Sequence, residues 1–142
     1  MNDTQANCRV FERYIEAFNS NDVDGWMGVL TDDFRLRGKG MPPSGIDHNI
    51  GKEDLCQNMT RYREQFRQTI HLTIDSIVCD GDRLAAECYS GAVLADGSTY
   101  ANQYSFHVRF RDGLIAEMNE YCCTYTVKSQ LRESGVGIGI EA

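Results

Sequence analysis

Hydrophobic residues in the first part of the chain recur at the spacing of helices. Residues 7–20 place apolar side chains at i, i+3, i+4 and i+7, which predicts a helix with one apolar stripe. A second helix is predicted directly afterwards, with Asn21 or Asp22 as its N-cap and Trp26 on its apolar face. A third helical pattern occupies residues 52–68. The N-terminal part of the chain is therefore predicted to be mainly helical.

The segment between the second and third helical patterns does not keep this spacing. Residues 33–37 predict a short strand. Residues 38–51 contain both prolines and four glycines, so we expect them to form an irregular loop.

The second half of the chain changes to the alternating pattern of strands. Asp-Gly pairs occur at 80–81, 96–97 and 112–113, each 16 residues after the last, and Asp-Gly readily adopts the positive φ values of hairpin turns. The runs between these pairs are rich in Ile, Val, Tyr, Phe and Thr. They predict a four-stranded antiparallel meander over residues 69–79, 83–94, 98–110 and 114–127.

These elements together predict an α+β fold. Strands of this length twist and curl, and we expect the three N-terminal helices to pack into a strongly curved antiparallel sheet, giving a cone-like domain with an internal pocket. A chain of 142 residues suits one domain, which we assign to residues 1–128. The glycine-rich residues 129–142 are expected to form a C-terminal tail.

Charge and composition exclude several classes of function. The chain has 14 Lys and Arg against 21 Asp and Glu, a formal charge of −7 with no basic stripe, so we expect no binding to nucleic acid or to an anionic membrane. No apolar run is long enough for a membrane span or a signal peptide, and we predict a cytoplasmic protein.

Cysteine and histidine positions give no sign of a metal site. None of the six cysteines forms a C-x-x-C pair, so we expect reduced thiols and no zinc. The three histidines are scattered, which makes a preformed metal site unexpected. The chain also lacks a phosphate-binding glycine loop and a dinucleotide fingerprint, and we predict no cofactor.

The strand at 98–110 has a clear inward face on hydrophobicity alone. That face carries Tyr100, Asn102, Tyr104, Phe106, Val108 and Phe110. The strands at 83–94 and 114–127 have no plainly polar face, which fits a sheet whose outer face is also covered, for instance in a dimer. Alternation alone therefore leaves the orientation of these two strands open.

The order of elements resembles the nuclear transport factor 2-like superfamily, which includes ketosteroid isomerases and SnoaL-like polyketide cyclases. The resemblance covers residues 8–127 and is carried by "FERYIEAFNSNDVDGWMGVLTDDF", "GKEDL" and "DGSTYANQYSFHVRFRDGLIAEMNEY". It implies the cone-like fold and a homodimer formed through the outer face of the sheet. Because this fold hosts enzymes and non-enzymes alike, the resemblance alone does not assign a function.

Residue by residue, the resemblance favours the cyclases over the isomerases. The isomerase tyrosine that hydrogen-bonds the substrate oxygen corresponds to Tyr14. The isomerase general base falls near Gly38 and its second oxyanion acid falls on Phe106, so steroid isomerisation by that mechanism is not expected. The acid/base aspartate of the cyclases corresponds to Glu120, although their partner histidine also falls on Phe106.

The same alignment implies which side chains face the cavity. The implied inward set is Tyr14, Glu87, Tyr89, Asn102, Tyr104, Phe106, Met118, Glu120 and Cys122. Two further candidate ligand contacts are Trp26, which is otherwise core, and His48, which sits in a loop that would cover the cavity mouth or remain solvated. Glu87 could equally turn outward, and Glu120 could be a hydrogen-bonded structural carboxylate.

A carboxylate in an apolar cavity has a raised pKa, which suits a general base acting on a carbon acid. We therefore interpret Glu120 as a candidate base, with Tyr14, helped by Asn102 or Tyr104, donating hydrogen bonds to the enolate. The leading hypothesis is cofactor-independent proton transfer on a small hydrophobic carbonyl compound, of isomerase, cyclase or lyase type. A non-catalytic binder of small hydrophobic molecules and a protein-interaction module are the alternatives.

Overall fold

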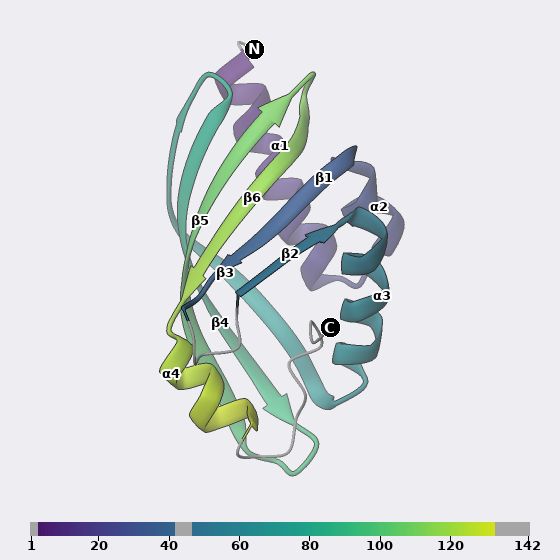
Figure 1. Ribbon diagram of the computed structural model, residues 1–142, viewed down its shortest axis with the longest axis vertical. Helices are drawn as coiled ribbons and strands as arrows, with labels where there is room; N and C mark the ends of the chain where they lie inside the picture. Colours follow the sequence, from purple (N-terminus) through teal and green to yellow (C-terminus); the bar gives the residue numbers. More distant parts are fainter. Residues whose placement is uncertain (1–2, 42–46, 133–142) are drawn as a thin grey trace.

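A computed structural model of the protein describes residues 3–41 and 47–132. Its helices are α1 (Asp3–Asn19), α2 (Val23–Gly28), α3 (Lys52–Arg63) and α4 (Thr124–Thr126), and α4 continues as the π-helical segment η1 (Val127–Arg132). Its strands are β1 (Leu30–Lys39), β2 (Asp47–Gly51), β3 (Phe66–Asp80), β4 (Arg83–Leu94), β5 (Thr99–Arg111) and β6 (Leu114–Cys122). The first three helices lie on one face of the sheet (Figure 1).

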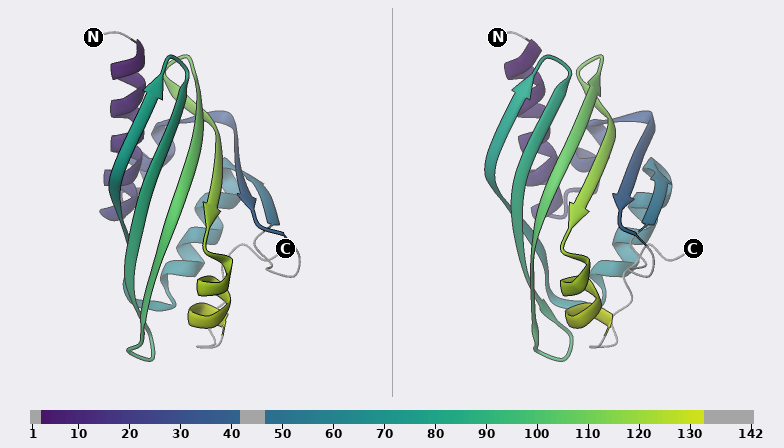
Figure 2. Two further views of the ribbon diagram at one scale, coloured as in Figure 1. Left: turned by 90° about the vertical axis from the view of Figure 1, so that its left-hand side faces the viewer. Right: turned by 60° about the vertical axis from the view of Figure 1, so that its left-hand side comes forward.

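The six strands form one mixed sheet in the order β2-β1-β6-β5-β4-β3. The strands β3 to β6 form the antiparallel meander that the sequence predicts, and they lie side by side in Figure 2. At the last hairpin Asp112 and Gly113 both adopt positive φ, 52° and 76°, as a two-residue turn with this twist requires. The α+β prediction is confirmed, with one addition, because β1 runs parallel to β6.

Three predicted boundaries are wrong. Residues 38–51 are not all irregular, because β1 reaches Lys39 and pairs with β2, and Arg35 on β1 donates to Asn49 on β2 (Nε to Oδ1 2.8 Å). The third helix ends at Arg63, since β3 already begins at Phe66. The last strand ends at Cys122, and the chain continues as α4 and η1 where a strand had been predicted. Residues 133–142 of the predicted tail lie outside the described residues.

The apolar stripe of α1 forms the centre of the core, as the sequence predicts. Phe11 is fully buried, and its ring packs against Phe106 of β5 with 6.3 Å between the ring centroids. The side chain of Asp22 caps α2 by accepting a hydrogen bond from the Gly25 amide at 3.0 Å. No helix in the described ranges has the length and apolar character needed to cross a membrane.

The orientation of β4 differs from the expected one. Leu84 and Leu94 face inward near its ends, and the four inward residues between them are small. Each of the four stands directly beside a larger inward residue of β5; the pairs are Ala86–Phe106, Cys88–Tyr104, Ser90–Asn102 and Ala92–Tyr100. The expectation that Glu87 and Tyr89 face the cavity is wrong, because they alternate with these small residues and lie on the outer face. Tyr89 is 49% exposed, and Glu87 accepts a hydrogen bond from the Ser76 hydroxyl at 3.2 Å.

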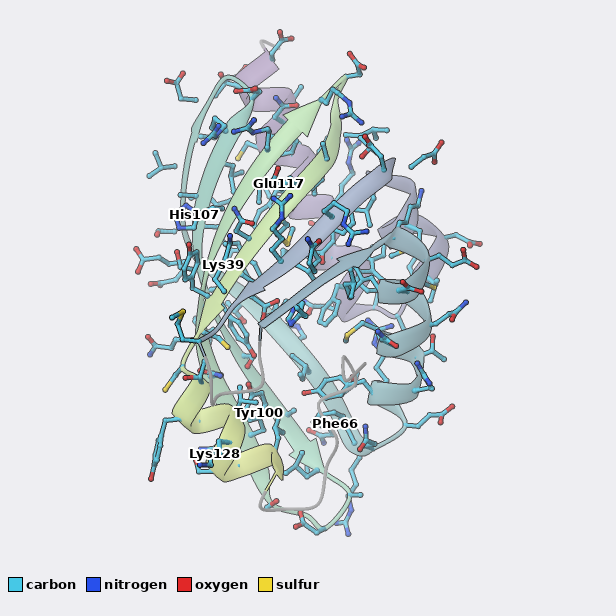
Figure 3. The ribbon with its side chains drawn as sticks, viewed as in Figure 1. Lys39, Phe66, Tyr100, His107, Glu117 and Lys128 are labelled. Atoms are coloured by element: carbon cyan, nitrogen blue, oxygen red, sulfur yellow. The ribbon has the colours of Figure 1, made fainter. Side chains whose placement is uncertain are left out.

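The C-terminal helical segment covers the end of β5 that extends beyond β6. The amide of Ala101 donates to the Gln130 side chain at 3.1 Å, and Figure 3 shows Tyr100 and Lys128 at this same end of the molecule. Val127 and Leu131 of this segment are buried. The chain after β6 therefore contributes to the core and to the wall of the cavity described next.

Candidate functional site

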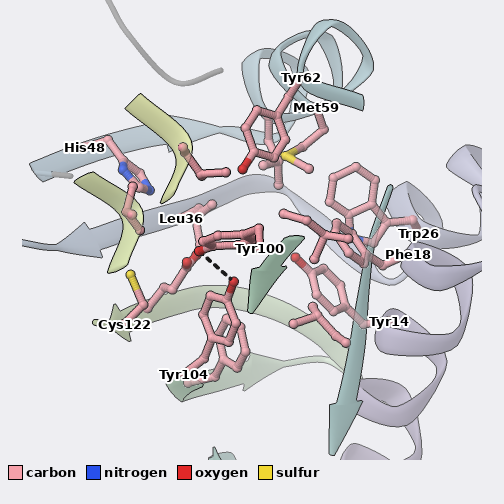
Figure 4. A pocket seen from close by; sticks show the side chains of 17 residues that line it. Tyr14, Phe18, Trp26, Leu36, His48, Met59, Tyr62, Tyr100, Tyr104 and Cys122 are labelled. Carbon is pink, nitrogen blue, oxygen red and sulfur yellow. Dashed lines mark hydrogen bonds between the residues drawn. The ribbon is translucent and has the colours of Figure 1, made fainter. Parts of the chain in front are cut away.

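A pocket of about 120 Å³ lies between the helices and the face of the sheet that they cover. Seventeen side chains line it (Figure 4). They come from α1, α2, α3, β1, β2, β3, β5, β6 and η1, and most are aliphatic or aromatic. The polar members are Tyr14, His48, Tyr62, Tyr100, Tyr104, Glu120 and Cys122. Among these described lining residues Glu120 is the one carboxylate, and there is no Lys or Arg.

Strand β6 places Glu120 in this pocket. The strand alternates between faces, so Glu120 points to the same side as the fully buried Met118, beside Phe106 of β5. Glu120 keeps some solvent access through the pocket, yet protein atoms surround its carboxyl group. This desolvation raises the pKa of Glu120 from 4.5 to about 7. Near neutral pH the group can therefore both accept and release a proton.

Four tyrosines surround the carboxyl group. Figure 4 shows the hydroxyls of Tyr14, from α1, and Tyr62, from α3, pointing into the pocket, while Tyr100 and Tyr104 enter it from β5. Burial raises the pKa of all four phenols, that of Tyr100 to about 12, and the negative charge of Glu120 raises them further. They are therefore neutral hydrogen-bond donors at physiological pH, grouped around one carboxylate.

The two tyrosines of β5 belong to a hydrogen-bonded chain. The hydroxyls of Tyr100 and Tyr104 lie 3.3 Å apart (Figure 4), and the Tyr104 hydroxyl is 3.0 Å from that of Ser90. The amide of Asn102 donates to the Tyr100 oxygen at 2.9 Å and to the Cys123 carbonyl at 3.1 Å. Because Asn102 occupies one lone pair of the Tyr100 oxygen, it restricts the directions in which the Tyr100 proton can point.

The remaining predicted site residues divide between the pocket and its surroundings. Trp26, His48, Phe106 and Cys122 line the pocket together with Tyr14, Tyr104 and Glu120. Asn102 and Met118 face inward but lie behind the wall, so the structure offers Asn102 as a partner of Tyr100 and not as a direct donor to a ligand. Glu87 and Tyr89 are on the opposite face of the sheet.

His48 enters the pocket from a strand. The sequence predicts an irregular loop at this position, whereas His48 lies on β2, paired with Gly38 of β1. The pairing fixes the backbone at position 48, and the imidazole forms part of the pocket wall.

Sequence reasoning missed two of the four phenols as site residues. Tyr62 shares the apolar side of α3 with Leu55 and Met59, a pattern that indicates burial but not which cavity the helix faces. Tyr100 was recognised as inward but not as part of the site. The hairpin turn at residues 95–98 carried a usable signal for the orientation of β4. Pairing across this turn matches even-numbered residues of β4 with even-numbered residues of β5, so the two sets share one face of the sheet.

The groups of this site are able to move protons within a largely apolar pocket. In the described part of the chain, no three His, Cys, Asp or Glu side chains gather closely enough to hold a metal ion. A carboxyl group that titrates near neutrality and several neutral phenols can move a proton and hold a developing oxyanion.

Comparison with known proteins identifies the fold. The family model of the SnoaL-like domain matches residues 11–118. PrhC from Penicillium brasilianum NBRC 6234 has a similar structure, with a TM-score of 0.82 and 13% identity over 98% of this chain and 96% of that one. An M. tuberculosis LEH-like epoxide hydrolase has a TM-score of 0.75 and 20% identity, covering 95% of this chain and 96% of its own.

A third similar structure is a protein from Xanthomonas campestris pv. campestris designated a candidate polyketide cyclase. Its TM-score is 0.73 at 21% identity, over 91% of this chain and 98% of that one. At these levels of identity the structural similarities show a shared fold and no more. A search of curated protein sequences gives no significant match.

Proposed function

The chain belongs to the SnoaL-like domain family, as its resemblance predicts, and on that premise we propose that it catalyses proton transfer on a small, apolar carbonyl compound without a cofactor. The proposed reaction is of isomerase, cyclase or lyase type. The fold accommodates different chemistries, since its structural relatives include proteins named for epoxide hydrolysis and polyketide cyclisation. The residues of the pocket must therefore carry the argument.

One observation supports the proposal most strongly. Glu120 is a single carboxyl group in an apolar pocket, and desolvation raises its pKa to about 7. A general base is most effective when its pKa lies near the working pH, because it is then both available and basic enough. A carboxylate kept only for structure would be expected to have hydrogen-bond donors that stabilise its charge and lower its pKa. For Glu120, in contrast, desolvation by burial is the cause that sets the direction of the pKa shift.

The surrounding groups suggest how the reaction proceeds. The Glu120 carboxylate removes a proton from the carbon next to the carbonyl group, and the electron pair of that C–H bond moves toward the carbonyl oxygen. Phenolic hydroxyls, with Tyr14 and Tyr62 pointing into the pocket, donate hydrogen bonds to the oxygen as it becomes negative. A proton then returns to another carbon of the same intermediate, which completes an isomerisation, and loss of the proton from Glu120 restores the carboxylate.

The size and charge of the pocket limit the substrate. Its volume of about 120 Å³ is of the order of the ~150 Å³ cavity known to hold benzene, so one ring or a short branched chain fits inside. The aromatic and aliphatic lining favours an uncharged compound. No Lys or Arg is among the described lining side chains, so the pocket offers no permanent positive charge to bind an anionic substrate.

The test is exchange of substrate hydrogens with solvent. Small ketones such as cyclohexanone and acetophenone are incubated in D₂O, and loss of the α-hydrogen signals is followed by NMR. We expect the protein to accelerate exchange, with a rate that rises with pH as Glu120 ionises near pH 7. Glu120→Gln should reduce the acceleration by about 10²–10⁴-fold, the usual contribution of a general base.

Glu87→Gln is the matched control, because it makes the same chemical change on the outer face of the sheet. It should leave the exchange rate unchanged. Exchange that continues undiminished in Glu120→Gln would show that Glu120 is not the base.

A second candidate function is binding of a small hydrophobic molecule without turnover. It is favoured by Phe106 and Gly38, which stand where the resembling enzymes carry an acid or a base. Ligand-observed NMR separates the two proposals, because a pure binder would retain the same ketones without exchanging their hydrogens.

We further propose that the protein is a homodimer through the outer face of its sheet. This face exposes Val78, Tyr89 and Tyr121, whose exposed fractions are 72%, 49% and 47%, an unusual surface for a sheet facing water. Sedimentation at micromolar concentration should show a dimer, and Tyr89→Ser with Tyr121→Ser should shift it toward monomer. A wild-type monomer would rule this interface out.

A further inference from the structure

Three strands that are distant in sequence place His48 and Glu120 in one row across the sheet. Gly38 of β1 pairs with His48 of β2 on one side and with Glu120 of β6 on the other. Residues in register on neighbouring strands point to the same face, and both side chains line the pocket. His48 and Glu120 therefore lie one strand apart in the sheet, on either side of Gly38.

Gly38 itself contributes no side chain between them. It is a buried position of β1, on the inward face together with Leu36. Since neighbouring strands are 4.7–4.9 Å apart, the backbones of His48 and Glu120 are about 9–10 Å apart, a span that two such side chains can cover by extending toward each other. A larger residue at position 38 would stand between them.

The two groups are also the ones in the pocket suited to exchanging protons near neutral pH. Imidazole is the side chain most used for proton exchange at neutral pH, and desolvation raises the pKa of Glu120 to about 7. The other titratable groups that face them keep their protons, because burial raises their pKa values; these are Tyr14 from α1, Tyr62 from α3, Tyr100 and Tyr104 from β5, and Cys122 from β6. No Lys or Arg is among the described lining residues.

We propose that His48 and Glu120 form the acid–base pair of this pocket and act across the side-chain-free position of Gly38. The inference rests on the proposed function and gives it a second catalytic residue. Glu120 removes a proton from carbon while the His48 imidazolium donates its proton to the other end of the substrate. A proton then passes from the Glu120 carboxyl to the neutral imidazole, directly or through water, which restores both groups with no net gain or loss of protons.

The pair is tested without a substrate by its mutual electrostatic effect. The pKa of the His48 imidazole is measured by NMR in the wild type and in Glu120→Gln, and that of the Glu120 carboxyl in the wild type and in His48→Gln. Removing the carboxylate should lower the pKa of His48 by roughly one unit, and removing the imidazole should raise that of Glu120 by a similar amount. His71 and His107, which lie outside the pocket, are internal controls in the same spectra.

Gly38→Val provides a second variant for the same measurement. Its side chain separates the pair, so Glu120→Gln should shift the His48 signal less in this background than in the wild type. Absence of any reciprocal shift in the wild-type background would overturn the pairing, whatever the enzyme's activity.

The exchange assay distinguishes failure of this inference from failure of the proposed function. We expect His48→Gln to slow ketone exchange by about 100-fold or more. Loss of exchange in Glu120→Gln with full retention in His48→Gln would leave the proposed function standing and overturn the role of His48. If the wild type exchanges no ketone, the proposed function fails at that point, and a reciprocal shift would then support only the pairing of the two groups.

Discussion

Desolvation of Glu120 has a consequence for stability that can be measured without knowing the substrate. The folded protein holds the Glu120 proton more tightly than the unfolded chain, because the pKa rises from 4.5 to about 7 on folding. Below about pH 4.5 both states are protonated and the group has no effect. Between these values the unfolded chain releases the proton first, so the free energy of unfolding falls as pH rises. Above about pH 7 Glu120 is ionised in both states, and the free energy of unfolding falls no further on its account.

The size of this effect follows from the rise in pKa. Each pKa unit corresponds to 1.36 kcal/mol, so a rise from 4.5 to about 7 corresponds to about 3 kcal/mol. This is an upper bound, since some solvent reaches Glu120 through the pocket. Gln has the shape of Glu but carries no charge at any pH. Glu120→Gln should therefore match the wild type at about pH 4 and exceed its stability by up to about 3 kcal/mol at about pH 8.

The assay is urea unfolding of both proteins at a series of pH values. The difference in unfolding free energy between Glu120→Gln and the wild type is plotted against pH, and Glu87→Gln serves as the control on the exposed face. A difference that grows between about pH 4 and about pH 8 supports the burial of a titrating carboxylate. A flat difference, or a variant that is less stable at the higher pH, would refute the reasoning and leave Glu120 without its role as a base.

Three further predictions concern other parts of the fold. Asn102→Ala breaks the link between Tyr100 and the chain after β6, and urea unfolding should show a loss of about 1–3 kcal/mol. Gly113→Ala should cost about 1 kcal/mol because φ is 76° there, whereas Gly28→Ala in α2 should be neutral or stabilising by the same measurement. Exposed Cys123 should react with an alkylating reagent before buried Cys88, as measured by mass spectrometry. The hydrogen bond from the Thr126 hydroxyl lowers the pKa of Cys123, whereas burial raises that of Cys88 to about 11. Equal rates of alkylation would contradict this prediction.

Periodicity along the chain was enough to predict the three N-terminal helices and the antiparallel meander. The apolar stripe of α1 predicted which face of the helix is buried, and Phe11 and Phe18 lie on that face. The three Asp-Gly pairs predicted where the meander turns. These signals are local, because each depends on neighbouring residues in the chain. The family followed from the order of the same elements.

Local signals failed where both faces of a strand are partly apolar. In the middle of β4 the inward residues are the small Ala86, Cys88, Ser90 and Ala92, while the larger Tyr89 lies on the outer face. Alternation therefore left the orientation of β4 open, and the face that the resemblance placed inward was the wrong one. What decides the orientation is the space left by the large residues of β5, such as Phe106, which is a property of the packed sheet.

The candidate site depends on the tertiary structure to a greater degree. The sequence identified Glu120 and Tyr14 through family resemblance, but nothing local indicates that Tyr62 of α3 faces the same carboxyl group. The row of His48, Gly38 and Glu120 arises because β1 runs parallel to β6 and antiparallel to β2. Residues ten and eighty-two positions from Gly38 meet beside it only when the sheet has formed, because strand pairing, unlike alternation, is set by contacts between distant segments.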